Sequence, residues 1–265
     1  MLLFVTFRFS FLRTPMSSAF FARTMSIYQS RAFQKLEELV AQQSRVGDSV
    51  FFDKEQFRWA QKLEDNWQVI RQEAEQVLQY VDKLPNYQDI SQRQSSISNN
   101  DRWKTYFFYA FGMKATKNCD RCPQTAKLLE DIPGLKVAFF SILAPGKHIP
   151  KHRGKLKNLI RYHLGVIVPE PKEKCGIQVN NEVAHWEEGK SLIFDDTFYH
   201  EAWNQTDGYR VVLFLDIARP LRFPMSLVSW LAFNLLIASP VVQDAKKNYE
   251  TWEKWFEEIE GKSPS

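Results

Sequence analysis

Cysteine is scarce in this chain of 265 residues, which contains only Cys119, Cys122 and Cys175. Three thiols form no disulfide framework, and a single Cys-x-x-Cys pair without a second pair is weak evidence for a zinc site. Hydrophobic residues make up 44% of the chain and aromatic residues 14%, which is the composition of a globular protein. We therefore expect a hydrophobic core, not cross-linking, to hold the fold.

A dominant charge of either sign is also missing. The 35 lysines and arginines are nearly balanced by 31 aspartates and glutamates, which leaves a net charge of +4. Most basic residues are interspersed with acidic ones, whereas nucleic-acid-binding proteins usually cluster their basic residues. The sequence therefore predicts no nucleic-acid partner.

Acidic residues are absent from the first 36 positions, where arginines recur among Phe, Ser, Thr and Leu. This composition is typical of a targeting segment, or of sequence upstream of the true start, since Met16 and Met25 are alternative starts. Its apolar run is too short to span a bilayer. We expect residues 1–26 to be disordered or to act in targeting, and the compartment stays open between cytoplasm and membrane periphery.

A second segment, Phe223 to Gln243, carries no charge over 21 residues. Pro224 and Pro240 bracket it, so its helical part is too short for a membrane span. One interpretation is a buried helix that closes the core, and the other is an element that rests in a membrane interface. The two prolines around a charge-free helix favour peripheral membrane contact.

Helical patterns come first along the chain and strand patterns follow. Apolar residues at steps of three and four predict helices over 27–46 and 55–83, and the 243–259 segment is helical again. From Val137 the pattern changes to β-branched and aromatic runs separated by Pro, Gly and Asn turns. No internal repeat is visible. We predict one main domain over 27–220, with its strand core at 137–220, followed by a C-terminal apolar segment and helix at 221–265.

All five histidines lie between His148 and His200, within this strand region. His152 and His200 occupy the setting of a mononuclear iron site, which needs imidazole nitrogens on one side and open positions on the other. Many such sites use a His-x-Asp pair, but here Arg153 and Gly154 follow His152, so the expected carboxylate is missing.

Cationic residues nearby favour an anionic ligand. Arg161 and His163 are two apart on one strand and so share a face. Arg210 opens the last strand, where a buried guanidinium is costly unless it meets an anion. That anion is either a bound dicarboxylate or a carboxylate of the protein, Asp195 or Asp216.

Residues of about 57 to 220 resemble the aspartyl/asparaginyl β-hydroxylase family of iron- and 2-oxoglutarate-dependent oxygenases. The resemblance lies in the succession LEDNWQVIRQE, CPQTAKLLEDIPG, SILAPGKHIPKHRG, IRYHLGVIVP, WEEGKSLIFDD and FYHEAW. It implies a jelly-roll, or double-stranded β-helix, mainly β with flanking helices. It also implies Fe(II) held by His152 and His200, with 2-oxoglutarate and O2 as cosubstrates.

By the same matching, Ser141 and Arg210 would hold the far carboxylate of 2-oxoglutarate, while Arg161 and His163 would contact its metal-side carboxylate. His148 and Trp186 match family positions with a structural or supporting role. His185 precedes Trp186 in a turn, and we expect it to be exposed.

Two substrate classes stay open at this stage, and a peptidyl Asp or Asn is slightly favoured over an acyl chain. The peptidyl hydroxylases of the family also have Gly at the place of Gly154, which favours hydroxylation of a peptidyl Asp or Asn. The related lipid A fatty-acyl 2-hydroxylases keep His-x-Asp, yet DIARPL at 216–221 and the apolar segment after it look more like that branch. A third hypothesis, a noncatalytic binding protein on the same barrel, rests only on the missing carboxylate.

Overall fold

The computed structural model describes residues 30–90, 100–110 and 112–260. Residues 1–26 and most of the polar loop at 91–101 lie outside the described residues. The chain divides into two compact units, residues 1–39 and 40–265. Helix α2 (Arg31–Gln42) accounts for the described part of the first unit and runs into the first residues of the second.

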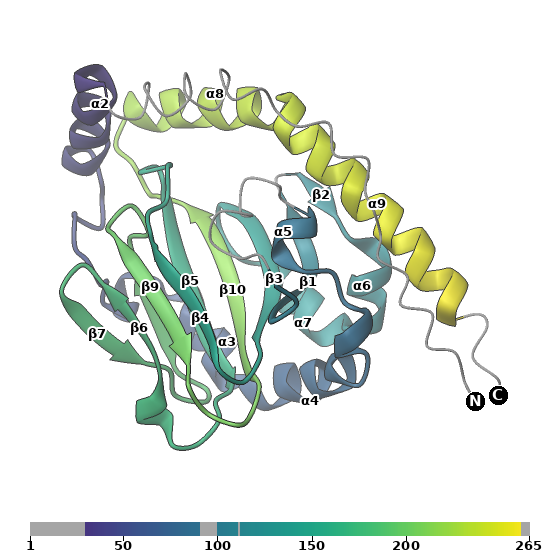
Figure 1. Cartoon of the computed structure of the whole chain (residues 1–265). Coiled ribbons are helices and arrows are strands. Elements are labelled where there is room, and N and C mark those ends of the chain that lie inside the picture. Colours follow the sequence, from purple (N-terminus) through teal and green to yellow (C-terminus); the bar gives the residue numbers. More distant parts are fainter. Residues whose placement is uncertain (1–29, 91–99, 111, 261–265) are drawn as a thin grey trace, which may run out of the picture. The chain divides into compact units, whose positions relative to one another are not determined.

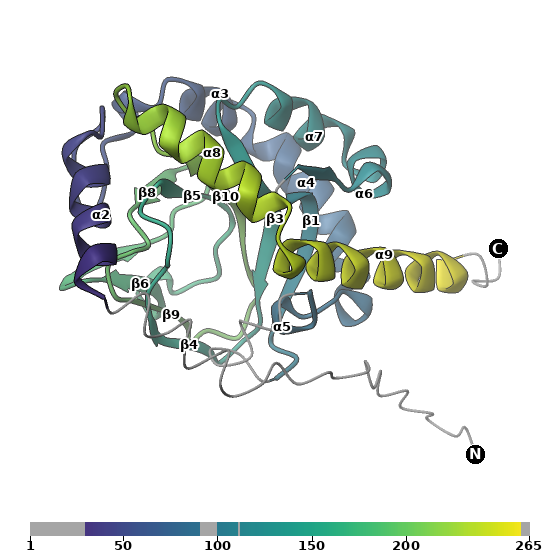
Figure 2. The same cartoon turned by 90° about the horizontal axis from the view of Figure 1, so that it is seen from above.

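Two antiparallel sheets form the centre of the second unit (Figure 1). The larger has the order β2-β1-β3-β10-β5-β8 and the smaller the order β4-β9-β6-β7. Seen from above, strands of the two sheets face one another, which is the predicted jelly-roll (Figure 2). The strands are β1 (Trp103–Ala110), β2 (Met113–Lys114), β3 (Leu135–Leu143), β4 (Lys147–His152), β5 (Leu159–Ile167), β6 (Cys175–Val179), β7 (Glu182–His185), β8 (Ser191–Phe194), β9 (His200–Asn204) and β10 (Arg210–Ala218).

The larger sheet begins earlier in the chain than the strand pattern indicated. Strands β1 and β2 precede Val137, the first residue of the predicted strand core. Strand β1 is covered on both faces, so its aromatic run WKTYFFYA shows no alternation of polar and apolar residues. A strand without that alternation cannot be told from a buried helix by periodicity alone.

Helices cover the larger sheet. The predicted helix over 55–83 is interrupted at Asn66, but its apolar stripe is buried as expected, through Leu63, Ile70, Ala74 and Val77. Glu73 on the same stripe accepts the backbone N–H groups of Gln124 at 2.9 Å and Thr125 at 2.8 Å, and so caps α7, the helix that begins at Pro123. The helices of this region are α3 (Trp59–Asp65), α4 (Trp67–Leu78), α5 (Tyr87–Ile90), α6 (Thr116–Arg121) and α7 (Pro123–Glu130), with 3-10 turns at Lys54–Gln56, Val81–Lys83 and Lys172–Lys174.

The C-terminal segment forms α8 (Met225–Ile237) and α9 (Pro240–Glu260). Helix α9 buries Tyr249, Trp252 and Phe256 against the core. Helix α8 buries only Ser229 and Phe233, so little of it is covered by the described part of the protein. Within that part, no single helix is long and apolar enough to cross a membrane, whereas α8 and the 242–254 part of α9, bent by 52°, meet the length and composition criteria as a pair.

Candidate active site

His152 and His200 lie directly opposite one another on strands β4 and β9 of the smaller sheet. Their ring centroids are 4.2 Å apart. His200 is 4% exposed and His152 is half-buried at the end of β4. The structure thus brings together the two residues that the sequence analysis selected as metal ligands.

Backbone carbonyls fix the tautomer of both rings. Nδ1 of His152 lies 2.8 Å from the carbonyl oxygen of Pro150, and Nδ1 of His200 lies 2.9 Å from that of Phe198. A carbonyl can only accept, so each Nδ1 carries the proton and each Nε2 keeps a lone pair. Burial lowers the pKa of His152 to about 3 and that of His200 to about 4, so both rings are neutral near pH 7. Neutral imidazoles with free Nε2 atoms and carbonyl-anchored Nδ1 atoms suit a divalent metal.

No third metal ligand is in place: across the described ranges, no group of three or more His, Cys, Asp or Glu could hold a metal ion. The carboxylate of Asp196 does, however, lie against Gly154. A Cβ atom added to Gly154 would be 2.2 Å from Oδ2 of Asp196, and the Gly154 N–H donates to the Asp196 carbonyl at 2.6 Å. The space that a side chain at position 154 would need is therefore filled by the Asp196 side chain, which comes from the connection between β8 and β9.

Arg210 is a buried guanidinium without a carboxylate partner among the described residues. It is 2% exposed, its Nη1 donates to the carbonyl and hydroxyl oxygens of Ser141 at 3.3 and 3.5 Å, and its Nε has no hydrogen-bond partner. Burial lowers its pKa to about 10. A buried cation with an unused donor indicates a site for an anion.

The protein carboxylates considered as partners of Arg210 are engaged elsewhere, so that alternative was wrong. Asp216 lies opposite Arg161 in the register of β10 and β5, and the two side chains pair at 3.0 Å. Asp195 pairs with Arg219 and Lys157. Spacing along the chain placed both aspartates near Arg210 in sequence but could not fix the cross-strand register.

His163 also has an unused polar atom. Its Nδ1 accepts a hydrogen bond of 3.3 Å from the indole Nε1 of Trp186, while its Nε2 is buried without a partner. Burial and the nearby Arg210 lower the pKa of His163 well below its usual value, so the ring is neutral. Because Nδ1 accepts, the proton is on Nε2, which is a free donor.

These residues form one continuous group. Ring contacts run from His200 to Phe194, from Phe194 to His163 and from His163 to Trp186, with centroids 5.2 to 6.0 Å apart. The guanidinium of Arg210 lies 4.5 Å above the Trp186 ring. The histidine pair and the unpaired cation therefore flank the same buried interior.

Arg161 also faces this interior, and Phe214 packs against both Arg161 and His163. The Arg161 guanidinium pairs with Asp196 at 2.8 Å as well as with Asp216. Burial opposes its charge, but the two carboxylates raise the pKa of Arg161. Arg161 is thus already held by protein groups, unlike Arg210.

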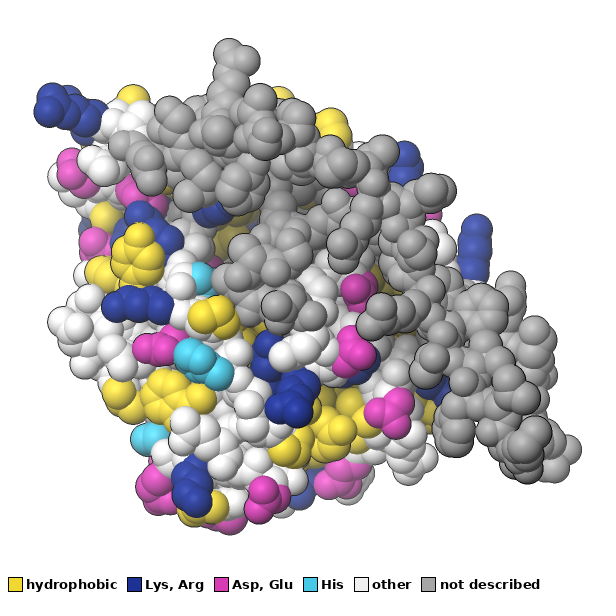
Figure 3. Space-filling view, viewed as in Figure 1, with side chains coloured by type: hydrophobic (Ala, Val, Ile, Leu, Met, Phe, Trp, Pro, Cys, Tyr) yellow, Lys and Arg dark blue, Asp and Glu magenta, His cyan; other side chains and the backbone are white. Residues whose placement is uncertain are grey.

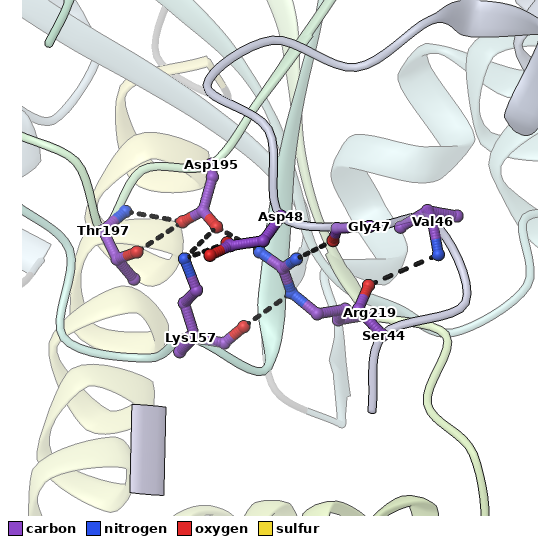
Figure 4. A network of polar contacts seen from close by, with 8 residues as sticks. All are labelled: Ser44, Val46, Gly47, Asp48, Lys157, Asp195, Thr197 and Arg219. Carbon is purple, nitrogen blue, oxygen red and sulfur yellow. Dashed lines mark hydrogen bonds and ion pairs between the residues drawn. The ribbon is translucent and has the colours of Figure 1, made fainter. Parts of the chain in front are cut away.

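A second buried ion network holds the segment that leads to His200 (Figure 4). Oδ2 of Asp195 receives Arg219 and, at 2.8 Å, Lys157, while Oδ1 accepts the Thr197 N–H at 3.0 Å. Although burial opposes ionisation, the two cations lower the pKa of Asp195. This network fixes the residues on either side of Asp196.

The sequence analysis missed two residues of the site. Trp103 donates from Nε1 to the Ser141 hydroxyl at 3.0 Å, and the carboxylate of Asp196 lies against Gly154. The sequence held no signal for the contact between Asp196 and Gly154, because the two residues lie on different connections between strands. The run FDDTFYH placed it near His200 but not beside Gly154.

The remaining two histidines, His148 and His185, make other contacts. His148 makes an exposed 2.8 Å ion pair with Glu201 when protonated, and His185 is exposed as predicted, with Nδ1 3.1 Å from the Cys175 carbonyl. Figure 3 shows the face seen in Figure 1, on which basic, acidic, histidine and apolar side chains are intermixed. Trp186, which matched a supporting position, is 1% exposed and orients His163.

Comparison with known proteins adds to this geometry. The sequence model of the aspartyl/asparaginyl beta-hydroxylase family matches residues 64–220. The ornithine lipid ester-linked acyl 2-hydroxylase of Rhizobium tropici is 46% identical over 220 residues, which cover 83% of this chain and 78% of that protein. The aspartyl/asparaginyl beta-hydroxylase of Homo sapiens is 34% identical over 163 residues, 60% of this chain but 21% of that protein.

Among solved structures, a prolyl-4-hydroxylase from Pseudomonas putida aligns with a TM-score of 0.40 and 14% identity, over 60% of this chain and 98% of that chain.

Proposed function

Since the chain belongs to the aspartyl/asparaginyl beta-hydroxylase family, we propose that it is an Fe(II)- and 2-oxoglutarate-dependent hydroxylase of an unactivated C–H bond. The observation that carries the proposal is the pair of unpartnered buried donors, Nε2 of His163 and Nε of Arg210. Leaving such groups unpaired costs about 1 to 3 kcal/mol each, and more for a charged group. A bound dicarboxylate would satisfy both.

The residues present fit the two groups that this chemistry requires. His152 and His200 would hold the iron through Nε2, and water and cosubstrate would fill its other positions. Arg210 and Ser141 would bind the far carboxylate of 2-oxoglutarate, with His163 and Arg161 at the metal-side carboxylate. Bound iron and 2-oxoglutarate would supply the oxygen chemistry that hydroxylates the substrate, with release of succinate and CO2.

Ser141 is set up as a donor toward that carboxylate. Its hydroxyl oxygen accepts from Trp103 at 3.0 Å and faces Arg210 Nη1 at 3.5 Å, so its own proton remains available. Ser141, His163 and Arg210 thus offer three hydrogen-bond donors to a ligand in this interior. Among the described residues, no carboxylate pairs with Arg210.

For the substrate, we infer an acyl chain of a lipid. The relative named as an acyl 2-hydroxylase aligns over most of both chains, whereas the human relative named as an aspartyl/asparaginyl hydroxylase aligns over 21% of its own length. A peptidyl Asp or Asn is the second candidate, favoured by the glycine at position 154. Family membership argues against the third hypothesis, a noncatalytic binding protein.

The test is anaerobic mixing of the full chain with Fe(II) and 2-oxoglutarate, then addition of oxygen, with succinate measured in the presence of acyl lipids or Asp- and Asn-containing peptides. Lipid-dependent succinate and a hydroxylated acyl chain are expected. His152→Ala and His200→Ala are the controls, because one neutral nitrogen cannot hold a labile divalent ion against water. Succinate formation in either variant would refute the metal assignment, and peptide-dependent turnover alone would favour the second candidate.

A further inference from the structure

Helix α8 exposes a set of large apolar side chains. No charged residue occurs between Phe223 and Gln243. The exposed apolar residues at and along this helix are Phe223 (77% exposed), Leu227 (49%), Val228 (47%), Trp230 (58%), Leu231 (49%) and Leu235 (74%). Isolated exposed apolar residues are common, but five on one short helix, with Phe223 just before it, form a patch of the kind that marks an interaction site.

The opposite side of the helix is attached to the barrel. Ser229 and Phe233 are its buried residues, one turn apart. The Ser229 hydroxyl accepts the Asn158 amide at 3.0 Å, and the Lys136 ammonium lies 5.0 Å from the centre of the Phe233 ring. These contacts fix which face of α8 points outward, so the apolar patch is a defined surface.

The helix is connected to the active site through the link between β4 and β5. This link, residues 153–158, begins directly after His152 and contains Gly154. Its last residue, Asn158, bonds to Ser229 of α8, and its carbonyl accepts the Arg219 N–H at 2.9 Å. In Figure 1, α8 crosses above the ends of β5 and β10. A partner on α8 is thus held beside the segment that leads from the metal-binding histidine.

We propose that the outward face of α8 docks on an anionic lipid bilayer, at the level of the headgroups. Thirteen helical residues span about 20 Å, less than the hydrocarbon core of about 30 Å, so α8 alone would lie in the interface and not cross it. Tryptophan, represented here by Trp230, prefers this interface. Docking itself does not depend on the proposed function. Only the role of the docked surface, which is to bring an acyl chain to the active site, rests on that function.

Charge favours anionic over neutral lipid. Between Asp216 and Asp244 the chain has no acidic residue but has Arg219 and Arg222. Arg219 does not face a membrane, because it is 3% exposed and pairs with Asp195. Arg222 is exposed next to Phe223, and its Nη1 donates to the carbonyl oxygens of Gln42 and Ser44 at 3.3 and 3.4 Å. Carbonyl oxygens do not neutralise the guanidinium, so Arg222 supplies the positive charge of this stretch to a lipid headgroup.

The test is flotation of the full chain with phosphatidylglycerol vesicles and with phosphatidylcholine vesicles. The unmodified protein should float with the former and more weakly with the latter. Leu231→Glu/Leu235→Glu should lower vesicle binding at least about tenfold, because two apolar contacts are replaced by charge. Arg222→Gln should lower binding to phosphatidylglycerol about fivefold and leave binding to phosphatidylcholine unchanged.

Val183→Glu is the matched control, since Val183 is 55% exposed but lies on β7, away from α8 in the sequence. This variant should bind vesicles like the unmodified protein. Unchanged flotation of the double glutamate variant would overturn the proposal. A dimer that this variant converts to a monomer, with no vesicle binding by either protein, would instead assign the surface to a second copy. A fall in its unfolding midpoint without any flotation of the unmodified protein would mean that the chain itself covers α8.

Activity measurements separate this proposal from the proposed function. On vesicles the double glutamate variant should lose turnover, while on a short-chain acyl lipid dissolved as a monomer it should match the unmodified protein. Vesicle binding without succinate formation on any acyl lipid would refute the acyl substrate but not the docking. Turnover on dissolved lipid without vesicle binding would refute the docking but not the function.

Discussion

The indole Nε1 of Trp186 donates to Nδ1 of His163 at 3.3 Å, and this bond decides which nitrogen of the histidine carries its proton. Both rings are buried, and the lowered pKa of His163 keeps it neutral. A neutral imidazole has one proton, so acceptance at Nδ1 makes Nε2 a donor. Trp186 thereby turns His163 into a group that can bind an anion without carrying charge.

Trp186→Phe should weaken 2-oxoglutarate binding about tenfold, because phenylalanine keeps a ring face under Arg210 but frees the His163 tautomer. Calorimetric titration of 2-oxoglutarate under anaerobic conditions with Fe(II) measures this. Trp230→Phe on α8 is the control and should bind normally. An unchanged dissociation constant in Trp186→Phe would remove His163 from cosubstrate binding.

Arg210→Ala should raise the 2-oxoglutarate dissociation constant by about two orders of magnitude or more, since removing one member of a buried charge pair costs about 3 to 5 kcal/mol. Ser141→Ala should do less, because a hydrogen bond to a charged group contributes about 1.5 to 3 kcal/mol. Arg210→Lys tests geometry, since it keeps the charge but lacks the planar fork. Equal affinity in the unmodified protein and Arg210→Ala would contradict the anion site.

Gly154→Asp should abolish metal binding or destabilise the protein, because its Cβ would meet the Asp196 carboxylate at 2.2 Å. Combining it with Asp196→Ala removes the obstruction and returns a carboxylate beside His152. The double variant should therefore fold better than Gly154→Asp and bind Fe(II) more tightly. Metal titration and thermal unfolding check both expectations, and equal behaviour of the single and double variants would mean that Asp196 is not the obstruction.

Asp195→Asn should destabilise the fold by about 3 to 5 kcal/mol, because Arg219 and Lys157 would lose their buried counter-charge. Asp48→Asn is the control: Asp48 also pairs with Lys157 but is 44% exposed, so its loss should cost about 0 to 1 kcal/mol. Denaturant unfolding measures both.

Acid should remove the contribution of Asp195. Its folded-state pKa is lowered from 3.8, so the ionised group stabilises the fold fully above that value and loses the contribution as pH falls through the lowered pKa. The stability difference between the unmodified protein and Asp195→Asn should thus be constant near neutral pH and shrink below pH 3.8. A difference that stays constant in acid would exclude an ionic role.

The sequence by itself determined many of the elements and the chemistry of the individual residues. Apolar periodicity placed the stripe of α4, and β-branched and aromatic runs placed β3, β5, β6, β8 and β10. The two histidines could be selected because their neighbours formed a recognisable succession, and Arg210 could be selected because a cation that opens a buried strand requires an anion. These inferences need only local spacing, which sets the face on which a side chain lies.

Only the tertiary structure decided which groups meet. Strand register pairs Asp216 with Arg161 and leaves Arg210 without a carboxylate among the described residues. The approach of two strand connections puts Asp196 against Gly154, and packing buries one side of α8 while leaving five of its large apolar side chains exposed. The physical reason is that the partner of a buried charge and the cover of an apolar face lie far away along the chain, where neither residue type nor periodicity carries information about distance.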